Sequence, residues 1–569
     1  MAHEHFDAVV VGSGFGGSVT SYRLAEAGLD VCLLERGQAY PPGSFPRTPQ
    51  KMKRNFWDPS EGLYGMFDLW SFDGIDALIS SALGGGSIIY ANVLLRKDAD
   101  WFVHENPSTG ETTTWPVTRE DLDPHYDRVE DMLNAQRYPF DEPPYDQTPK
   151  TRELKRAAEQ LGLDWHRPNL AVTFANEGEV PVPGEPIEEE HDNLHGRTRT
   201  TCRLCGECDI GCNYGSKNTL DYNYLSAAER HGADIRTLCE VRSFEPRDDG
   251  YAVGYVEHDL ERAGTSFDTD ALPVHTITTD RLILSAGTLG STYLLLKNRD
   301  ALPGLSPRLG DRFCGNGDFL GFALDAERTD PETGETVPRV LDPNEGPVIT
   351  STVRVGDALD GGSATGRGFY IQDAGYPAFL SWLYESADVF GTLRRLVRTV
   401  RQFIRARVTG DTNLSAEIQS LIGGERSATA LPLLGMGRDR PTGTFRLEDG
   451  LLATDWRVDE SKDYFVRLRK TMKAIAGALG ADFLANPTWL LNRVITVHPL
   501  GGCPMGRSPE RGVVDEFGEV YNHPNLYVAD GSVLPGPVGP NPALTIAAVA
   551  DRIADHIIEE APRAADTTP

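Results

Sequence analysis

One glycine-rich turn near the N-terminus constrains the fold more than any other feature of this sequence. Residues 6–37, FDAVVVGSGFGGSVTSYRLAEAGLDVCLLERG, begin with a short apolar run, pass through the turn into a helical pattern from about Ser18 to Ala27, and close with a second apolar run. This order predicts a strand, a helix and a parallel strand, which make one βαβ unit. Parallel strands of this kind form sheets that helices cover, so the sequence predicts an α/β fold.

The turn has the glycine spacing of a dinucleotide site. Gly12 permits the sharp turn, Gly14 lets a pyrophosphate approach the backbone, and Gly17 lets the helix pack closely against the strand. Glu35 ends the second strand, where an acid accepts hydrogen bonds from ribose hydroxyls. An acid there disfavours a 2′-phosphate, which leaves NAD or FAD. The position of the unit at the N-terminus, with a C-terminal segment that returns to the cofactor site, favours FAD.

Size and charge limit the classes of protein. With 569 residues the chain is too long for one ordinary core, so we expect two domains or one domain with an insertion. The net charge of −29 would repel a polyanion, and we therefore expect no nucleic-acid partner. The chain has 10 Lys and 45 Arg. An acidic, lysine-poor composition fits either a halophilic-type surface, which high salt screens, or the codon usage of a GC-rich genome.

The N-terminal sequence and the length of the apolar runs together predict a cytoplasmic protein. No apolar run reaches the length of a membrane span. The N-terminus, MAHEHFDAVVV, enters the first strand at once and has no basic segment of a secretory signal. A basic stretch at 391–408, GTLRRLVRTVRQFIRARV, has the pattern of an amphipathic surface helix.

Five segments spread along the chain resemble one enzyme family. They are VVVGSGFGGS with LLERG near the start, LGGGSIIYANVLLR at 83–96, LSAGTLGSTYLLL at 284–296, VHPLGGCPMG at 497–506 and NLYVADGSVLPGPVGPNPALTIAAVADRIA at 525–554. Together they are similar to the glucose–methanol–choline (GMC) flavin oxidoreductases, most closely the bacterial cholesterol-oxidase-like branch. The resemblance implies a discontinuous Rossmann-type FAD-binding domain, over 1–100, 201–315 and 490–569. It also implies an α+β substrate domain on a mostly antiparallel sheet, over 101–200 and 316–489.

The resemblance makes His498 the active-site histidine and Asn541 its partner. Oxidising an alcohol removes a hydroxyl proton and passes a hydride to flavin N5. Histidine titrates near neutral pH and can take that proton, whereas an amide can orient the oxygen without competing for the proton. The resemblance also implies further cofactor contacts from Gly85, Gly86, Ser87, Val241, Asp530 and Gly531.

Two positions depart from the cholesterol-oxidase pattern. That branch has an asparagine where this chain has Tyr90, and Asn92 lies two residues later. A third catalytic acid of some members has no firm match, and Asp373 is the candidate. The expected partner is a small-molecule alcohol, with oxygen, a quinone or a redox protein as electron acceptor. Two alternatives stay open: a steroid or isoprenoid desaturase-type flavoenzyme, and a flavin and iron–sulfur electron-transfer protein.

Four of the eight cysteines gather in TCRLCGECDIGC, residues 201–212. Cys202, Cys205, Cys208 and Cys212 have the spacing C-x2-C-x2-C-x3-C, which holds cubane clusters in ferredoxins, although Asn213 replaces the proline that follows there. The alternatives are an iron–sulfur cluster that relays electrons from FAD, a structural zinc site, and metal-free structural thiols.

Overall fold

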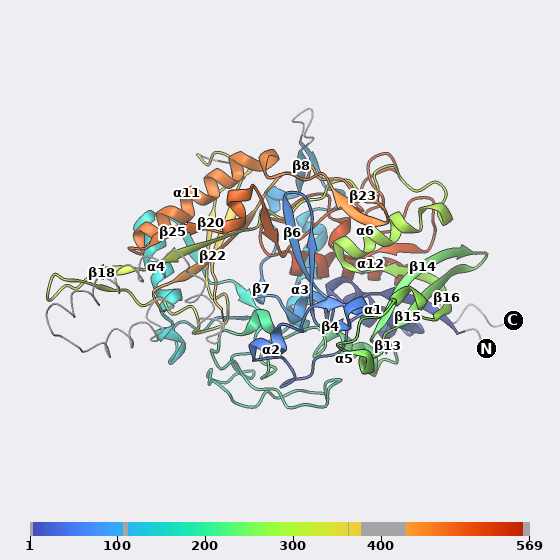
Figure 1. Ribbon diagram of the computed structural model, residues 1–569, viewed down its shortest axis with the longest axis horizontal. Coiled ribbons are helices and arrows are strands. Elements are labelled where there is room, and N and C mark those ends of the chain that lie inside the picture. The colour runs from blue at the N-terminus through green and yellow to red at the C-terminus, as the bar shows by residue number, and fades with distance from the viewer. Residues whose placement is uncertain (1–3, 106–111, 362, 377–427, 562–569) are drawn as a thin grey trace.

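Two large sheets organise the chain in the computed structural model (Figure 1). The structure describes residues 4–105, 112–361, 363–376 and 428–561. The amphipathic helix predicted at 391–408 lies outside the described residues. In Figure 1, strands β14, β15 and β16 lie at one end of the molecule, and β20, β22 and β25 with α4 and α11 lie at the other.

The first sheet contains the N-terminal βαβ unit. Its strand order is β13 (Asp234–Arg236), β2 (Val31–Leu34), β1 (His5–Val11), β16 (Val274–Leu284), β15 (Gly250–Glu257) and β14 (Cys239–Arg247), with β27 (Leu526–Val528) paired to β16. The strands β13, β2, β1, β16 and β27 run parallel, and β14 and β15 are antiparallel additions. The apolar runs of β1 and β2 are almost fully buried, as expected for strands covered on both faces.

Helices from both ends of the sequence cover this sheet. Helix α1 (Phe15–Glu26) packs on α12 (Ala543–Glu560) and on α5 (Tyr224–Arg230), and α12 packs on α3 (Arg119–Met132). Helix α6 (Gly287–Lys297) follows β16 directly. The predicted helix at Ser18 starts earlier, at Phe15, because the chain turns at Gly12 and two glycines fit within the first helical turn.

The second sheet is entirely antiparallel. Its order is β11 (Asp164–His166), β20 (Thr352–Val355), β21 (Phe369–Asp373), β22 (Leu431–Gly437), β17 (Phe319–Leu324) and β25 (Asp482–Ala485). Helices α11 (Lys462–Ala478) and α4 (Pro149–Leu161) pack against it around a separate apolar core.

The remaining strands are short and form small sheets of their own. A three-stranded sheet joins β26 (Val494–Thr496), β6 (Ile75–Ser80) and β5 (Phe67–Ser71), and another joins β10 (Gln136–Arg137), β12 (Asn169–Leu170) and β7 (Val93–Leu94). The remaining pairs are β3 (Trp57–Asp58) with β4 (Leu63–Tyr64), β8 (Val103–Glu105) with β9 (Thr112–Thr114), β18 (Glu327–Thr329) with β19 (Thr336–Pro338), and β23 (Phe445–Glu448) with β24 (Leu451–Thr454). A further short helix is α2 (Pro49–Met52).

This architecture confirms the predicted fold class. All strands of the first sheet come from 1–100, 201–315 and 490–569, and all strands of the second come from 101–200 and 316–489. Where one domain ends and the other begins stays a prediction. Among the described residues, no helix is both long and apolar enough to cross a membrane.

Candidate active site

The glycines of the first turn have the geometry that a dinucleotide site needs. Gly12 has a φ of +96°, and a Cβ added to Gly17 would lie 1.9 Å from the carbonyl oxygen of Gly12. Only glycine is tolerated at either position, because Gly12 has a left-handed backbone and Gly17 packs closely against Gly12. A Cβ added to Gly14 would meet no atom within 4 Å, so the backbone there faces open space that fits a pyrophosphate.

Glu35 is buried at the end of β2 and organises the turn. Its carboxylate accepts hydrogen bonds from the Ser13 amide at 3.0 Å, the Ser13 hydroxyl at 2.6 Å and the Gly37 amide at 2.8 Å. A carboxylate has about four acceptor positions, so one remains for a ribose hydroxyl. The ribose contact stays a prediction, as does the adenine contact of Val241, which lies on β14 opposite Tyr255.

A second glycine turn lies directly against the first. The 3-10 turn Gly85–Ile88 follows Gly84, and a Cβ on Gly85 would lie 2.5 Å from the Cα of Gly14. A Cβ on Gly86 would meet no atom within 4 Å. The Ser87 hydroxyl is occupied within the protein, since it donates to Gly84 O at 2.7 Å and accepts from Leu220 N at 3.1 Å. The two turns therefore form one open cradle of backbone, which fits FAD.

The C-terminal segment completes this cradle. A Cβ on Gly16 would lie 1.5 Å from the carbonyl oxygen of Ala529, so the two segments touch. Asp530 caps the 3-10 turn Gly531–Val533 by accepting from the Ser532 amide at 2.8 Å, and it also accepts from the Ser291 hydroxyl at 2.5 Å. The structure thus brings Asp530 and Gly531 beside the first turn, and their contact with FAD stays a prediction.

His498 is held by a buried carboxylate that the sequence did not identify. Its Nδ1 lies 2.8 Å from Asp318 Oδ1, and its ring is 14% exposed. The other oxygen of Asp318 accepts from the Thr496 hydroxyl at 2.9 Å and the Val497 amide at 2.8 Å, which fixes the carboxylate. With the proton of a neutral imidazole at Nδ1, Nε2 carries the free lone pair of a base.

Asn541 is oriented by a second residue that the sequence did not identify. Gln372 Nε2 donates to Asn541 Oδ1 at 2.7 Å, which leaves the Asn541 amide nitrogen as its free donor. Gln372 is fully buried, and its Oε1 has no partner. The carboxylate of the neighbouring Asp373, the candidate third acid, accepts from the backbone amides of Thr350 and Ser351, and its catalytic role stays a prediction. Successive residues of a strand face opposite sides, so only one of the pair can face Asn541.

One short turn links both candidate catalytic residues. Asn316 accepts from Gly539 N at 2.9 Å and donates to Pro540 O at 3.0 Å, just before Asn541. Two residues later, Asp318 holds His498. The fully buried Lys97 contacts the same loop, because it donates to Pro537 O at 2.8 Å and to Val538 O at 3.1 Å. The loop before Asn541 and the ring of His498 are therefore positioned together.

Comparisons with known proteins agree with this geometry. Residues 442–550 match the family described as GMC oxidoreductase, and residues 10–43 match an NAD(P)-binding Rossmann-like domain. The chain is 31% identical to a cholesterol oxidase of Mycobacterium tuberculosis, over 96% of this chain and 90% of the relative. The chain belongs to the GMC oxidoreductase family. It is an FAD-dependent oxidoreductase that acts on CH–OH groups, in the cholesterol-oxidase-like branch.

One further relative supports this placement, and one solved structure has a similar fold. The GMC oxidoreductase is 29% identical to a cholesterol oxidase of Acinetobacter baumannii, over 98% of this chain and 96% of the relative. Its fold is similar to the crystal structure of pyridoxine 4-oxidase from Mesorbium loti, with a TM-score of 0.57 and 16% identity, over 98% of this chain and all of that one. The family predicted from the five segments is confirmed.

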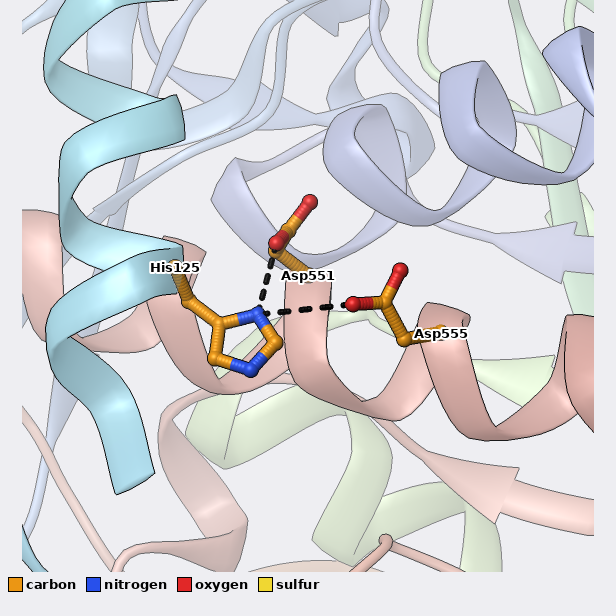
Figure 2. Close-up of side chains that lie close together, drawn as sticks. All are labelled: His125, Asp551 and Asp555. Carbon is orange, nitrogen blue, oxygen red and sulfur yellow. Dashed lines mark hydrogen bonds and ion pairs between the residues drawn. The ribbon is translucent and has the colours of Figure 1, made fainter. Parts of the chain in front are cut away.

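One group in this GMC oxidoreductase has the composition of a metal site but is an ion-pair network. Figure 2 shows His125 on α3 beside Asp551 and Asp555 on α12. Among the described residues, this is the one group of three His, Cys, Asp or Glu side chains whose ligand atoms lie within 4.8 Å of one another. Arg128 lies 2.5 Å from Asp551 and 2.6 Å from Asp555, and Arg23 lies 2.6 Å from Asp555. Although burial opposes it, His125 and the two arginines lower the pKa of Asp551. The carboxylates already have cationic partners, so the group joins α1, α3 and α12.

The four clustered cysteines lie together in the enzyme without forming a disulfide. They line one small cavity with Lys217, Gly346 and Pro347 among its other walls. No three of the four sulfur atoms lie within 4.8 Å of one another. Burial raises the pKa of the thiols of Cys202, Cys205 and Cys208.

Proposed function

We propose that this GMC oxidoreductase oxidises an alcohol to a carbonyl compound with His498 as the base. The observation that supports it most directly is the contact of 2.8 Å between Asp318 and Nδ1 of His498. Nε2 of the ring takes the hydroxyl proton, and the Asp318 carboxylate stabilises the imidazolium that results. When bound, FAD supplies the acceptor for the hydride that leaves the carbon bearing the hydroxyl group.

Asn541 positions the alcohol in this proposal. Its side-chain oxygen is engaged by Gln372, so its NH₂ group is left to donate to the substrate oxygen. A donor fixed in this way holds the carbon–hydrogen bond in one orientation, which lowers the entropy lost on reaching the transition state. Sterols are the first alcohols to test, because the two relatives at 29–31% identity are both described as cholesterol oxidases.

We also propose that electrons leave the flavin through an iron–sulfur cluster on the four-cysteine segment. This segment contacts the second glycine turn of the FAD cradle through Lys217, whose ammonium donates to both Ile88 O and Cys208 O. The electron acceptor is then a one-electron carrier.

The experiment for the base is rapid mixing of oxidised enzyme with alcohol in the absence of oxygen. A panel of cholesterol, a long-chain alcohol and a small diol is screened first by bleaching of the flavin. His498→Ala should slow flavin reduction by about 10²–10⁴, the usual contribution of a general base. His191→Ala, on an exposed loop, is the matched control and should be reduced at the wild-type rate. Wild-type rates in His498→Ala, with FAD retained, would contradict the proposal.

A further inference from the structure

The turn at residues 315–318 has a shape that follows from its local sequence, GNGD. Asp318 N donates to Gly315 O at 3.1 Å, which closes the turn. Its central residues, Asn316 and Gly317, have φ values of +52° and +68°. Two left-handed residues in succession are the pattern of a type I′ turn, for which Asn-Gly is the favoured pair. Local sequence therefore explains the shape of the turn, but not its place beside the active site.

Asp439 binds this turn through the backbone amides of the turn. Asp439 lies just after β22 and is fully buried. Its Oδ2 accepts from Gly315 N at 3.1 Å, and the amide of Gly317 is directed at the same carboxyl. Gly437, the last residue of β22, donates from its amide to Asn316 O at 2.9 Å. Three of the four residues of the turn are therefore bonded to the end of β22 or to Asp439.

Tyr464 binds the same turn from helix α11. Its ring is almost fully buried, and its hydroxyl donates to Gly317 O at 2.8 Å. Gly317 is thus held at its amide by Asp439 and at its carbonyl by Tyr464. The peptide groups on either side of Gly317 cannot rotate unless one of these buried hydrogen bonds breaks, so the turn is held firmly where it leads into Asp318.

Backbone pairing joins the turn to the segment that carries His498. Cys314, the residue before the turn, exchanges two hydrogen bonds with Leu500, each at 3.0 Å. The Thr496 hydroxyl donates to Gly315 O at 3.0 Å. The turn and the segment of His498 therefore form one unit, to which the contact between Asp318 and the ring belongs.

We propose that Asp439 and Tyr464 are positioning residues for the oxidation, because they attach this unit to the second sheet and to α11. Asn316 joins the loop before Asn541 to the same unit. The base and the donor of the proposed function thus move with the turn, and a loosened turn would misplace both of them. The inference rests on the proposed function, in which His498 and Asn541 act on the alcohol.

The surroundings of Asp439 suit an acceptor that is not charged itself. The groups that face its carboxyl are Asp318, Arg367, Cys314 and Tyr464. Burial raises the pKa of Asp439 to about 7, with Asp318 adding to the rise and Arg367 opposing it. A neutral carboxyl accepts hydrogen bonds from amides through its carbonyl oxygen, and the side chain of asparagine has the same acceptor. Asparagine should therefore replace Asp439 in this role.

The test is anaerobic flavin reduction by alcohol in variants of both residues. Asp439→Leu removes the acceptor for two backbone amides, whereas Asp439→Asn keeps an acceptor of the same shape. We expect Asp439→Leu to lower the limiting rate by about 10–10², because small displacements of reacting groups cost that much. The alcohol concentration for half of the limiting rate should change by less than about threefold, since the loss falls on the transition state. Asp439→Asn should stay within about threefold of the wild-type rate.

Tyr464→Phe keeps the proposal testable if Asp439→Leu does not fold. It removes one hydrogen bond to the turn and should lower the limiting rate by about three- to tenfold. Tyr251→Phe is the matched control: this buried tyrosine on β15 donates to Pro524 O at 2.9 Å, and the variant should be reduced at the wild-type rate. Wild-type rates in Tyr464→Phe or in folded Asp439→Leu would overturn the proposal. A loss in Asp439→Asn as large as that in Asp439→Leu would also overturn it.

A combination of Tyr464→Phe with His498→Ala separates positioning from general damage. If the turn acts through the base, Tyr464→Phe should slow His498→Ala by a smaller factor than it slows the wild type, with FAD retained in every sample. Equal factors in the two backgrounds would show independent effects and would overturn the proposal. The single variant His498→Ala tests the proposed function by itself, so a failure of that function is distinguishable from a failure of this inference.

Discussion

The carboxylate of Asp318 lies 2.8 Å from Nδ1 of His498, across 180 residues of sequence. This contact sets the tautomer of the ring, since a carboxylate accepts only from a protonated Nδ1. The lone pair of the base is then at Nε2. The arrangement also means that the positive charge formed when His498 takes a proton is next to a fixed negative charge.

Replacing Asp318 by asparagine should therefore impair proton removal while FAD stays bound. An amide can donate to Nδ1 and stabilise the wrong tautomer, and a change of this kind lowers the rate by about 10⁴ in a Ser-His-Asp triad. We expect the limiting rate of flavin reduction in Asp318→Asn to fall by about 10²–10⁴, with a pH profile displaced from that of the wild type. Stopped-flow measurement across pH checks this. An unchanged rate and profile would mean that Asp318 only supports the fold.

The sequence predicted the parts of the site that are formed by local structure. The roles of Gly12 and Gly17 follow from a turn between a strand and a helix, and each glycine has the expected constraint in the structure. His498 and Asn541 were found because short motifs surround them. Such motifs can be recognised from the sequence because all the residues that define them lie close together in the chain.

Asp318 and Gln372 could not be found in this way. Each reaches its partner across at least 169 residues, and the pairing of strands in the second sheet decides which side chains face the site. The choice between Gln372 and Asp373 shows the difficulty. A shift of one residue along β21 exchanges the two faces of the strand, and the sequence YIQDAGYP contains nothing that fixes this register.

A buried acid near the site should make stability depend on pH. Asp439 is fully buried, and burial raises the pKa of its carboxyl to about 7, with Asp318 adding to the rise. Because the folded pKa is above the unfolded value, the contribution of Asp439 to stability is complete below about pH 4 and is lost as the pH rises through about 7. Asp439→Asn removes this dependence. Between pH 5 and 8, we expect the wild type to lose several degrees of melting temperature relative to the variant.

Thermal unfolding of both proteins across pH checks this expectation. Asp459→Asn, at a largely exposed position, is the control and should follow the wild type at every pH. A constant difference between wild type and Asp439→Asn would show that Asp439 keeps one protonation state throughout the range. The two curves must be recorded at one ionic strength, because the net charge of the chain changes with pH as well.

Salt should stabilise the enzyme if its acidic composition is an adaptation to salt. With a net charge of −29 the chain repels itself, and the Debye length falls from about 30 Å at 0.01 M salt to about 3 Å at 1 M. We expect the melting temperature to rise steadily with KCl up to molar concentrations. A flat response above about 0.2 M would favour codon usage as the origin of the composition.

The partner of Asn541 offers a test with two opposite substitutions. Gln372→Leu removes the donor to Asn541 Oδ1, so the amide is free to rotate, and the loss of about one hydrogen bond should lower kcat/KM for the alcohol about tenfold. Gln372→Glu goes further, because an ionised carboxylate cannot donate and turns the NH₂ group of Asn541 away from the substrate. We therefore expect Gln372→Glu to be less active than Gln372→Leu at neutral pH and to recover as the pH falls and the new carboxyl is protonated.

Steady-state assays of both variants between pH 5 and 8, with flavin content measured in parallel, test this expectation. Equal activity of the two variants at every pH would mean that Gln372 packs beside Asn541 without orienting it.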